Sequence, residues 1–486
     1  MKKNNNWIFP VAFLIFIIFW KFISGEEDLK NNYPNIVLVM TDDQGWGQTG
    51  YYNHPLLKTP NLDLMAKSGL RLDRFYAGAP QCSPTRASVL TGRNNDRTGV
   101  FYHGYSLNKN EVTIAQELKK IGYNTGHFGK WHLNGIRGPG VPIFKDDEYS
   151  PGEFGFDDWI SVTNFFDINP IMGDNGIIKE YRGSSSEVIV KQALNFIKKN
   201  VDNSKPFFTV IWDGSPHDPF VASEDDKVGF ENLDKKSREH YGEIVAFDRS
   251  IGVLRKGLKE MGVEKNTIIW YCSDNGGLKN ISPSTVGGLR GNKNTMWEGG
   301  LRVPAIIEWP ETIAPGITKY PASTMDIFPT ILEIVGLYPN NKYSNLDGKS
   351  ITNLFEANKH KRTLKIPFRF DNRGALIDNN IKLIAHDIEK LEFELYDLSN
   401  DPTESIDISK SNSQVFELMK NEFMIWNNSV DKEVNAMKFN HPKHWVIIEK
   451  YIKYFDQWIN RPEYSRWIGR ALKKEGPGYQ NFGPLK

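Results

Sequence analysis

The chain has 486 residues, enough to bury a large core and typical of two or three domains. Lysine and arginine number 60 against 59 for aspartate and glutamate, so no global charge points to nucleic acid or a membrane surface, and any preference for anions must be local. Two cysteines, Cys82 and Cys272, allow at most one disulfide, which excludes a disulfide-stapled scaffold.

Residues 1–25 have the pattern of a secretory signal peptide. A basic head precedes an apolar run over 7–20, and Ser24-Gly25 offers small residues for cleavage. The run is short for a membrane span, although 21–23 can extend it into an uncleaved anchor. We therefore expect an exported protein, periplasmic, extracellular or surface-bound, that is attached to a membrane only if this segment is not cleaved.

The first predicted strand, over 35–40, leads into two adjacent carboxylates. Its continuous apolar and β-branched residues are typical of a strand buried on both faces of a parallel sheet. Asp42 and Asp43 follow its carboxyl end, where open α/β sheets place their ligands. Because like charges repel, we expect a cation or strong pairing there, although an Asp-rich turn is the simpler interpretation of this segment alone.

The segment over 81–93 predicts a helix with a cysteine at its start. Pro84 pre-sets φ for a first helical turn, and Gly92 supplies a stop. Cys82 then lies at or just before the helix N-terminus, where free N–H groups and the dipole favour negative charge. Arg86 projects over the same surface one turn later. Taken alone, Cys82 is more simply a small buried hydrophobe.

Basic side chains follow two further predicted strands. Lys130 and His132 come after a strand over 123–127 and alternate by two, which puts both on one face of an extended segment and within reach of one anionic substrate. His217 lies between two prolines in the loop after a strand over 206–212, a good place for a site residue. In isolation, the lysine is more simply solvated and a histidine structural.

A second pair of oxygen ligands follows the predicted strand over 266–272. Cys272 inside this strand is expected to be a packing residue. Asp274 and Asn275 come directly after it, and carboxylate and amide oxygens are ligands that calcium prefers. Together with the two aspartates after the first strand, they would form an oxygen cage from two strand ends far apart in the sequence.

The other predicted elements complete an α/β pattern followed by a short antiparallel sheet. Helices are expected over 59–69, 112–121, 186–200, 236–261 and 325–335, and strands over 70–76, 303–308, 368–370, 375–377, 382–386 and 393–396. The segment 135–185 has little periodicity, which is typical of a pocket rim, and the tail from His441 is expected to pack back as helix and loop.

Several motifs occur in a fixed order along residues 35–404. They are Asp42-Asp43, Cys82-Ser83-Pro84-Thr85-Arg86 with Thr91-Gly92-Arg93, Gly129-Lys130-Trp131-His132-Leu133, His217, Gly291-Asn292-Lys293 with Trp297-Glu298-Gly299-Gly300-Leu301-Arg302-Val303-Pro304, and the stretch 395–404. This set resembles the type I, formylglycine-dependent sulfatases, an arylsulfatase-like family of the alkaline phosphatase superfamily. The resemblance implies an α/β fold with a large mixed, mostly parallel sheet sandwiched by helices and a smaller C-terminal antiparallel-sheet subdomain. It also implies a catalytic domain over 31–345 and a C-terminal subdomain and tail over 346–486.

The resemblance further implies a modified nucleophile and one metal ion. Cys82 would be converted to formylglycine by a formylglycine-generating or an anaerobic sulfatase-maturating enzyme, and the hydrate of this aldehyde would attack a sulfate ester. One Ca²⁺ would be held by Asp42, Asp43, Asp274, Asn275 and residue 82.

The same resemblance assigns roles to the basic residues. Lys130 would bind sulfate, and Arg86 would support the nucleophile and the metal. His132 would deprotonate the hydrate, and His217 with Lys293 would face the leaving oxygen. Glu298 and Arg302 are expected to give structural support.

Two alternatives remain open. A phosphodiesterase or phosphonate hydrolase of the same superfamily would use a similar site, and a non-catalytic, exported glycan-binding protein would keep Cys82 as a thiol. The expected partner is a sulfated carbohydrate or polysaccharide, with no role for nucleic acid. His103, Arg182 and Arg290 are further expected sugar contacts, although each is more simply a surface or structural residue.

Overall fold

The computed structural model describes residues 33–437 except 136–139, 141, 165, 167, 340–342, 344 and 357–360. The predicted signal peptide over 1–25 and the tail from His441 lie outside the described residues. Among the helices that the structure describes, none combines the length and apolar character needed to cross a membrane.

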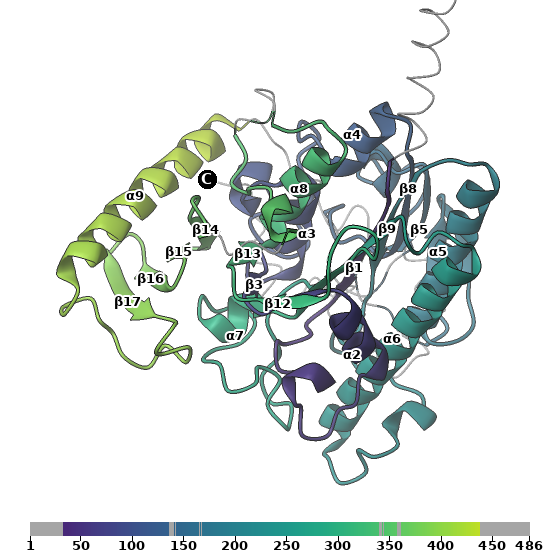
Figure 1. Ribbon diagram of the computed structural model, residues 1–486, viewed down its shortest axis with the longest axis horizontal. Coiled ribbons are helices and arrows are strands. Elements are labelled where there is room, and N and C mark those ends of the chain that lie inside the picture. Colours follow the sequence, from purple (N-terminus) through teal and green to yellow (C-terminus); the bar gives the residue numbers. More distant parts are fainter. Residues whose placement is uncertain are drawn as a thin grey trace, which may run out of the picture.

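A ten-stranded sheet forms the centre of the larger body (Figure 1). Its strands are β1 Asn35–Thr41, β2 Leu70–Leu72, β4 Asn124–Lys130, β5 Asp158–Val162, β6 Ile171–Asp174, β7 Ile177–Glu180, β8 Phe207–Trp212, β9 Thr267–Ser273, β11 Ala305–Glu308 and β12 Gly316–Thr318. The order is β12-β2-β11-β9-β1-β8-β4-β5-β6-β7, and the run from β9 to β5 is parallel. The carboxyl ends of these parallel strands meet at one edge, which brings together the residues that follow β1, β4, β8 and β9.

Helices cover both faces of this sheet because the central strands are apolar on both faces. The helices are α2 Pro60–Ser68, α3 Cys82–Thr91, α4 Ile114–Lys120, α5 Ser185–Asp202, α6 Lys235–Glu260 and α8 Ile327–Ile334. Ile36, Leu38 and Met40 of β1 join a core that includes residues of α3, α4 and α8, whereas Val37 and Val39 pack with residues of α2, α5 and α6. This two-sided burial matches the continuous apolar pattern of β1.

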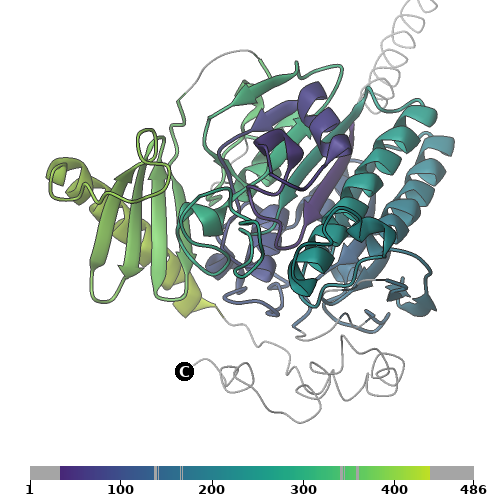
Figure 2. The ribbon, with the colours of Figure 1, turned by 90° about the horizontal axis from the view of Figure 1, so that it is seen from below.

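A second, four-stranded antiparallel sheet stands beside the larger body (Figure 2). It comprises β14 Ile366–Phe370, β15 Arg373–Asp378, β16 Ile381–Asp387 and β17 Glu392–Asp397, and its order follows the chain. One face packs on α9 (Ser413–Ala436) through Leu383, Leu395 and Phe423. The other face packs against the larger body, where Phe368 joins a cluster with Tyr76. The predicted fold class is confirmed, with α9 as an addition.

The predicted strand over 70–76 is wrong as a single element. Its two halves are separate strands, because β3 (Phe75–Tyr76) leaves the main sheet and pairs with β10 (Arg302–Val303) and β13 (Ala322–Ser323) in a three-stranded sheet. The split into two strands depends on pairing with strands that are distant in the sequence, so no local pattern indicates it.

The segment 135–185 contains more regular structure than its weak periodicity predicts. It contributes β5, β6 and β7 to the edge of the main sheet. Asn175 and Gly176 join β6 to β7 with φ values of 46° and 86°, the left-handed conformation that a two-residue hairpin requires. The Asn-Gly pair was therefore a local signal for this hairpin.

Candidate active site

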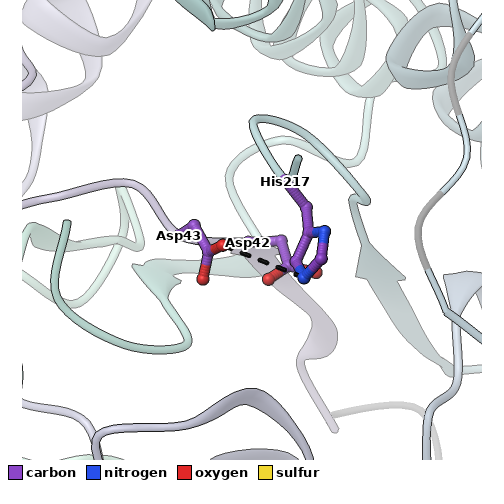
Figure 3. A group of neighbouring side chains, drawn as sticks. All are labelled: Asp42, Asp43 and His217. Carbon is purple, nitrogen blue, oxygen red and sulfur yellow. Dashed lines mark ion pairs between the residues drawn. The ribbon is translucent and has the colours of Figure 1, made fainter. Parts of the chain in front are cut away.

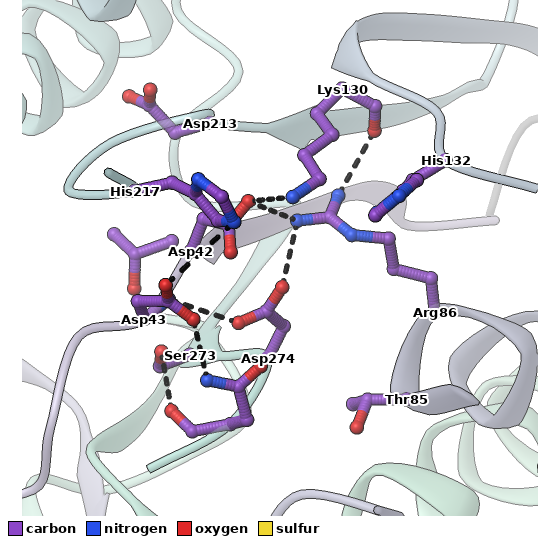
Figure 4. A network of polar contacts seen from close by, with 12 residues as sticks. Asp42, Asp43, Thr85, Arg86, Lys130, His132, Asp213, His217, Ser273 and Asp274 are labelled. Carbon is purple, nitrogen blue, oxygen red and sulfur yellow. Dashed lines mark hydrogen bonds and ion pairs between the residues drawn. The ribbon is translucent and has the colours of Figure 1, made fainter. Parts of the chain in front are cut away.

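The acidic residues of the site follow two neighbouring strands. β1 and β9 pair in parallel, with Thr41 opposite Ser273, so the residues after them are adjacent. The backbone N–H of Asp43 donates to Oδ1 of Asp274 at 3.1 Å, and Nδ2 of Asn275 donates to Oδ1 of Asp43 at 2.8 Å (Figure 4). Sheet register thus joins two motifs that lie far apart in the chain.

Buried oxygen atoms in this group lack hydrogen-bond donors. Among the described residues, Oδ1 of Asp42 and Oδ1 of Asn275 have no hydrogen-bond partner. Ligand atoms of Asp42, Cys82 and Asp274 all lie within 4.8 Å of one another, and so do those of Asp42, Asp43 and His217 (Figure 3). Unpaired buried oxygens are costly, and a hard cation with several oxygen ligands removes that cost. The residue set therefore fits Ca²⁺.

Cys82 is the first residue of α3, as predicted. Gln81 precedes it in an extended conformation, and Gly92 ends the helix with a φ of 69°. The side chain is buried, and burial raises the pKa of the Cys82 thiol. Because only a thiolate is strongly nucleophilic, an unmodified Cys82 is poorly suited to attack a substrate in this environment.

Arg86 is fully buried and points toward the carboxylates (Figure 4). Its Nη2 lies 2.9 Å from Oδ2 of Asp274 and 3.5 Å from Oδ2 of Asp42, and its Nη1 donates to the carbonyl of Lys130 at 2.9 Å. The guanidinium also lies 5.0 Å from the ring centroid of Trp212, a contact the sequence analysis missed and no motif signalled. Arg86 therefore positions the acidic cluster and the end of β4.

Two lysines pair with the first two aspartates. Nζ of Lys130 contacts Oδ2 of Asp42, and Nζ of Lys293 lies 2.5 Å from Oδ1 of Asp43. Burial would raise the pKa of Asp42, but the charges of Lys130 and its neighbours outweigh it and hold that pKa below its usual range. Burial would lower the pKa of Lys293, but Asp43 raises it. Lys293 therefore keeps its charge beside Cys82.

His132 reaches the site by a different local structure from the one predicted. β4 ends at Lys130, and His132 has a φ of 55°, so the two residues do not alternate along one extended segment. Its two ring nitrogens are buried and have no hydrogen-bond partner among the described residues. Burial, with a contribution from the charge of Lys130, places the pKa of His132 well below its usual value. The neutral imidazole is therefore a proton acceptor.

His217 is oriented by its own turn. Its Nδ1 donates to the carbonyl of Asp218 at 2.6 Å, and its Nε2 lies 3.9 Å from Oδ2 of Asp43. Burial lowers the pKa of His217 to about 4. Asp213 begins this turn, and its Oδ1 accepts the N–H of Ser215 at 3.0 Å. Asp213, which sequence reasoning did not single out, thus shapes the turn that presents His217.

The three further expected sugar contacts have different positions. The backbone N–H of His103 donates to Oε1 of Gln81, and its ring centroid lies 6.5 Å from that of His132, so His103 borders the site. Arg182 pairs with Glu180 on the exposed edge. Arg290 donates to the carbonyl of Glu404 and stacks on Trp297, so its role here is structural.

The fold and the site define an α/β protein of the alkaline phosphatase-like class, with clustered carboxylates that could hold a metal ion and with lysines beside them at the strand ends. A family model described as sulfatase matches residues 34–337, and one described as N-sulphoglucosamine sulphohydrolase, C-terminal, matches residues 291–428. The chain therefore belongs to the sulfatase family.

Individual relatives agree with this assignment. The N-acetylgalactosamine-6-sulfatase of Rattus norvegicus is 34% identical over 342 residues, covering 63% of each chain. The ulvan-active sulfatase of Formosa agariphila is 31% identical over 363 residues, covering 68% of this chain and 66% of the relative. A solved structure, described as the crystal structure of Ps i-CgsB, has 26% sequence identity to this chain and a TM-score of 0.73, and the match covers 81% of this chain and 92% of that chain. The match thus spans less than two thirds of the mammalian relative's length.

Proposed function

We propose that this protein hydrolyses sulfate esters of a sulfated carbohydrate. The observation that carries this proposal is the arrangement around Cys82, where two lysines pair with carboxylates and three carboxylates converge at the ends of neighbouring strands. Such a site supplies both ligands for a cation and positive charge for a sulfate ester, whose oxygens carry the negative charge of the transition state.

The proposed chemistry requires a modified residue 82 and a bound Ca²⁺. Formylglycine hydrate at position 82 would supply an oxygen nucleophile, and Ca²⁺ would favour its deprotonated form. Asp42, Asp43, Asp274 and Asn275 would hold the ion, since their oxygens converge and two of them lack donors among the described residues. A maturating enzyme of the formylglycine-generating or the anaerobic type is the required partner.

The lysines and histidines of the site would bind the sulfate group and take part in proton transfer. Lys130 and Lys293 would bind sulfate oxygens, since their ammonium groups flank the aspartates next to residue 82. His132, held neutral by burial, would accept a proton from the hydrate. His217 and Lys293 would face the leaving oxygen.

The carbohydrate part of the proposal draws on the relatives. One is named for sulfated N-acetylgalactosamine and another for ulvan. His103 borders the site next to His132 and is therefore placed to contact a sugar.

Mass spectrometry across residue 82 is the first test, on protein expressed with a maturating enzyme. We expect the mass of an aldehyde or its hydrate in place of the thiol. A panel of sulfate and phosphate esters then tests the reaction, with Cys82→Ala as the unmodifiable control. Faster hydrolysis of phosphate esters, or equal activity of Cys82→Ala, would contradict the proposal.

We also propose that residues 1–25 direct export to the periplasm or the cell surface. The basic head and the short apolar run support this proposal. Cell fractionation with N-terminal sequencing tests it, and an uncleaved cytoplasmic product would contradict it.

A further inference from the structure

A fully buried lysine of the four-stranded sheet contacts two carboxylates beside the active site. Nζ of Lys382, on β16, lies 3.0 Å from Oε1 of Glu298 and 2.7 Å from Oε1 of Glu404, and all three side chains have no exposed surface. Burial would lower the pKa of Lys382, but the two carboxylates raise it, so the lysine keeps its charge. Desolvation offsets much of the energy of such a buried cluster, so its role is better sought in the positions that it fixes.

Glu404 connects this cluster to both ends of the segment that carries Lys293. We call residues 290–298 the Lys293 segment. The Oε2 of Glu404 accepts the backbone N–H of Glu298 at 2.6 Å, and its carbonyl accepts Nη1 of Arg290 at 2.6 Å. The Arg290 guanidinium lies 3.6 Å from the ring centroid of Trp297, which also contacts Tyr396 of β17.

One further contact joins the four-stranded sheet to this segment, and another joins the segment to the residue before Cys82. Nη1 of Arg373, on β15, donates to the carbonyl of Asn294 at 2.9 Å, directly after Lys293. The side chain of Asn294 accepts from Nε2 of Gln81, the residue before Cys82. The four-stranded sheet and the loop after it therefore contact the segment at its start, its middle and its end.

The Lys293 segment and the two glycines after it also pack tightly against the loop that follows β9. The N–H of Lys293 donates to the carbonyl of Gly277, and the N–H of Gly276 donates to the carbonyl of Gly300, both at 3.0 Å. A Cβ on Gly299 would lie 2.4 Å from the carbonyl oxygen of Gly291, and one on Gly300 would lie 2.1 Å from that of Thr295. A shift of the backbone at residue 298 is therefore transmitted to Lys293.

We propose that Lys382 and Glu404 are positioning residues that hold the Lys293 segment against the site, so that the four-stranded sheet sets where the Lys293 ammonium group lies. The kinetic consequence rests on the proposed function. The positional part does not, because it concerns only contacts within this chain.

Hydrogen exchange of the full chain tests the positional part. Lys382→Met removes the cation, and Glu404→Gln removes one charge but keeps an acceptor for the N–H of residue 298. Glu433→Gln is the matched control, since Glu433 ties α9, the helix packed on the four-stranded sheet, to Arg93 and Arg97 of the larger body. We expect exchange across 290–300 to be about tenfold faster in the first two variants and unchanged in the control. Equal exchange in wild type and Glu404→Gln would overturn the proposal, even if Lys382→Met fails to fold.

Kinetics of the matured protein test the consequence for Lys293. If Lys293 assists the leaving oxygen, Lys382→Met should slow sulfate esters of poorly acidic alcohols more than aryl sulfates. The double variant Lys293→Met/Lys382→Met should be no slower than Lys293→Met alone, because the two changes act through one group. Additive losses would contradict the inference. An inactive wild type would instead refute the proposed function, and exchange alone would then decide the positional claim.

Discussion

Replacing Arg86 with methionine should destabilise the protein in a manner that depends on calcium. Nη2 of Arg86 lies 2.9 Å from Oδ2 of Asp274 in a site without exposed surface, and Asp42 already has Lys130 as a second cation. Arg86→Met thus leaves Asp274 without its buried counter-ion. Removing one partner of a buried pair costs about 3–5 kcal/mol, because the other charge stays desolvated and unpaired.

Two effects set where in that range the loss falls. Burial and the neighbouring Asp42 already raise the pKa of Asp274 to about 7, so the carboxyl of the variant takes up a proton near neutral pH and part of the penalty disappears. Calcium bound to the native carboxylates would stabilise the folded state by about 2.7 kcal/mol at a concentration one hundred times its dissociation constant. Because Arg86 lowers the pKa of Asp274 in the native protein, the variant keeps part of this proton even at pH 8, and we expect a loss near the lower end of the range without calcium. The loss should be smaller with calcium, because the bound cation would replace Arg86 as the counter-charge of Asp274.

Equilibrium urea unfolding at pH 8, with and without excess Ca²⁺, measures both quantities. The control is Arg255→Met, which breaks another largely buried pair, between Arg255 and Glu308, away from the site. Its cost should be the same with and without calcium, because neither side chain belongs to the acidic cluster. A loss below about 1 kcal/mol for Arg86→Met in both conditions, or an equal calcium effect in both variants, would refute this account of the site.

Three further predictions concern pH, proton transfer and metal. Nδ1 of His54 accepts the N–H of Leu57 at 2.8 Å, and burial lowers its pKa to about 4. As the pH falls, His54 of the unfolded chain therefore takes up a proton before His54 of the folded protein does. About 3 kcal/mol of the free energy of unfolding, fully present above pH 6.5, should be lost as the pH falls toward 4. His54→Asn keeps an acceptor but cannot titrate, so its unfolding free energy should fall less over that range, and parallel pH curves would contradict the assignment. His132→Ala should release alcohol in a burst and then turn over about 10²–10⁴-fold more slowly, as stopped-flow assays can show, whereas a uniform loss in both phases would remove its role as base. Chelation should lower the thermal midpoint and the activity, and Ca²⁺ should restore both better than Mg²⁺, which requires stricter octahedral geometry. Equal recovery with the two ions would count against a calcium site.

The sequence predicts a set of residues that the structure brings together, because the motifs that carry them are local. A buried apolar strand precedes Asp42 and Asp43, and a cysteine precedes Pro84 at the start of a helix. Both are patterns of adjacent residues, so they are recognisable without the tertiary structure. β1 and α3 accordingly appear where they are predicted. The Asn175-Gly176 hairpin signal was also present, although the surrounding segment hid it.

Only the tertiary structure decides how these groups meet. The contact between Asp43 and Lys293 spans 250 positions and depends on the register of β1 and β9, which no local pattern encodes. His132 reaches the site through a left-handed backbone conformation that the packed surroundings stabilise, against the preference of a single residue. Long-range pairing and close packing also make the four-stranded sheet part of the Lys293 environment. The sequence by itself therefore determined which residues carry the motifs predicted for the site, and the tertiary structure determined which atoms face one another, because a large separation along the chain does not indicate the separation in space.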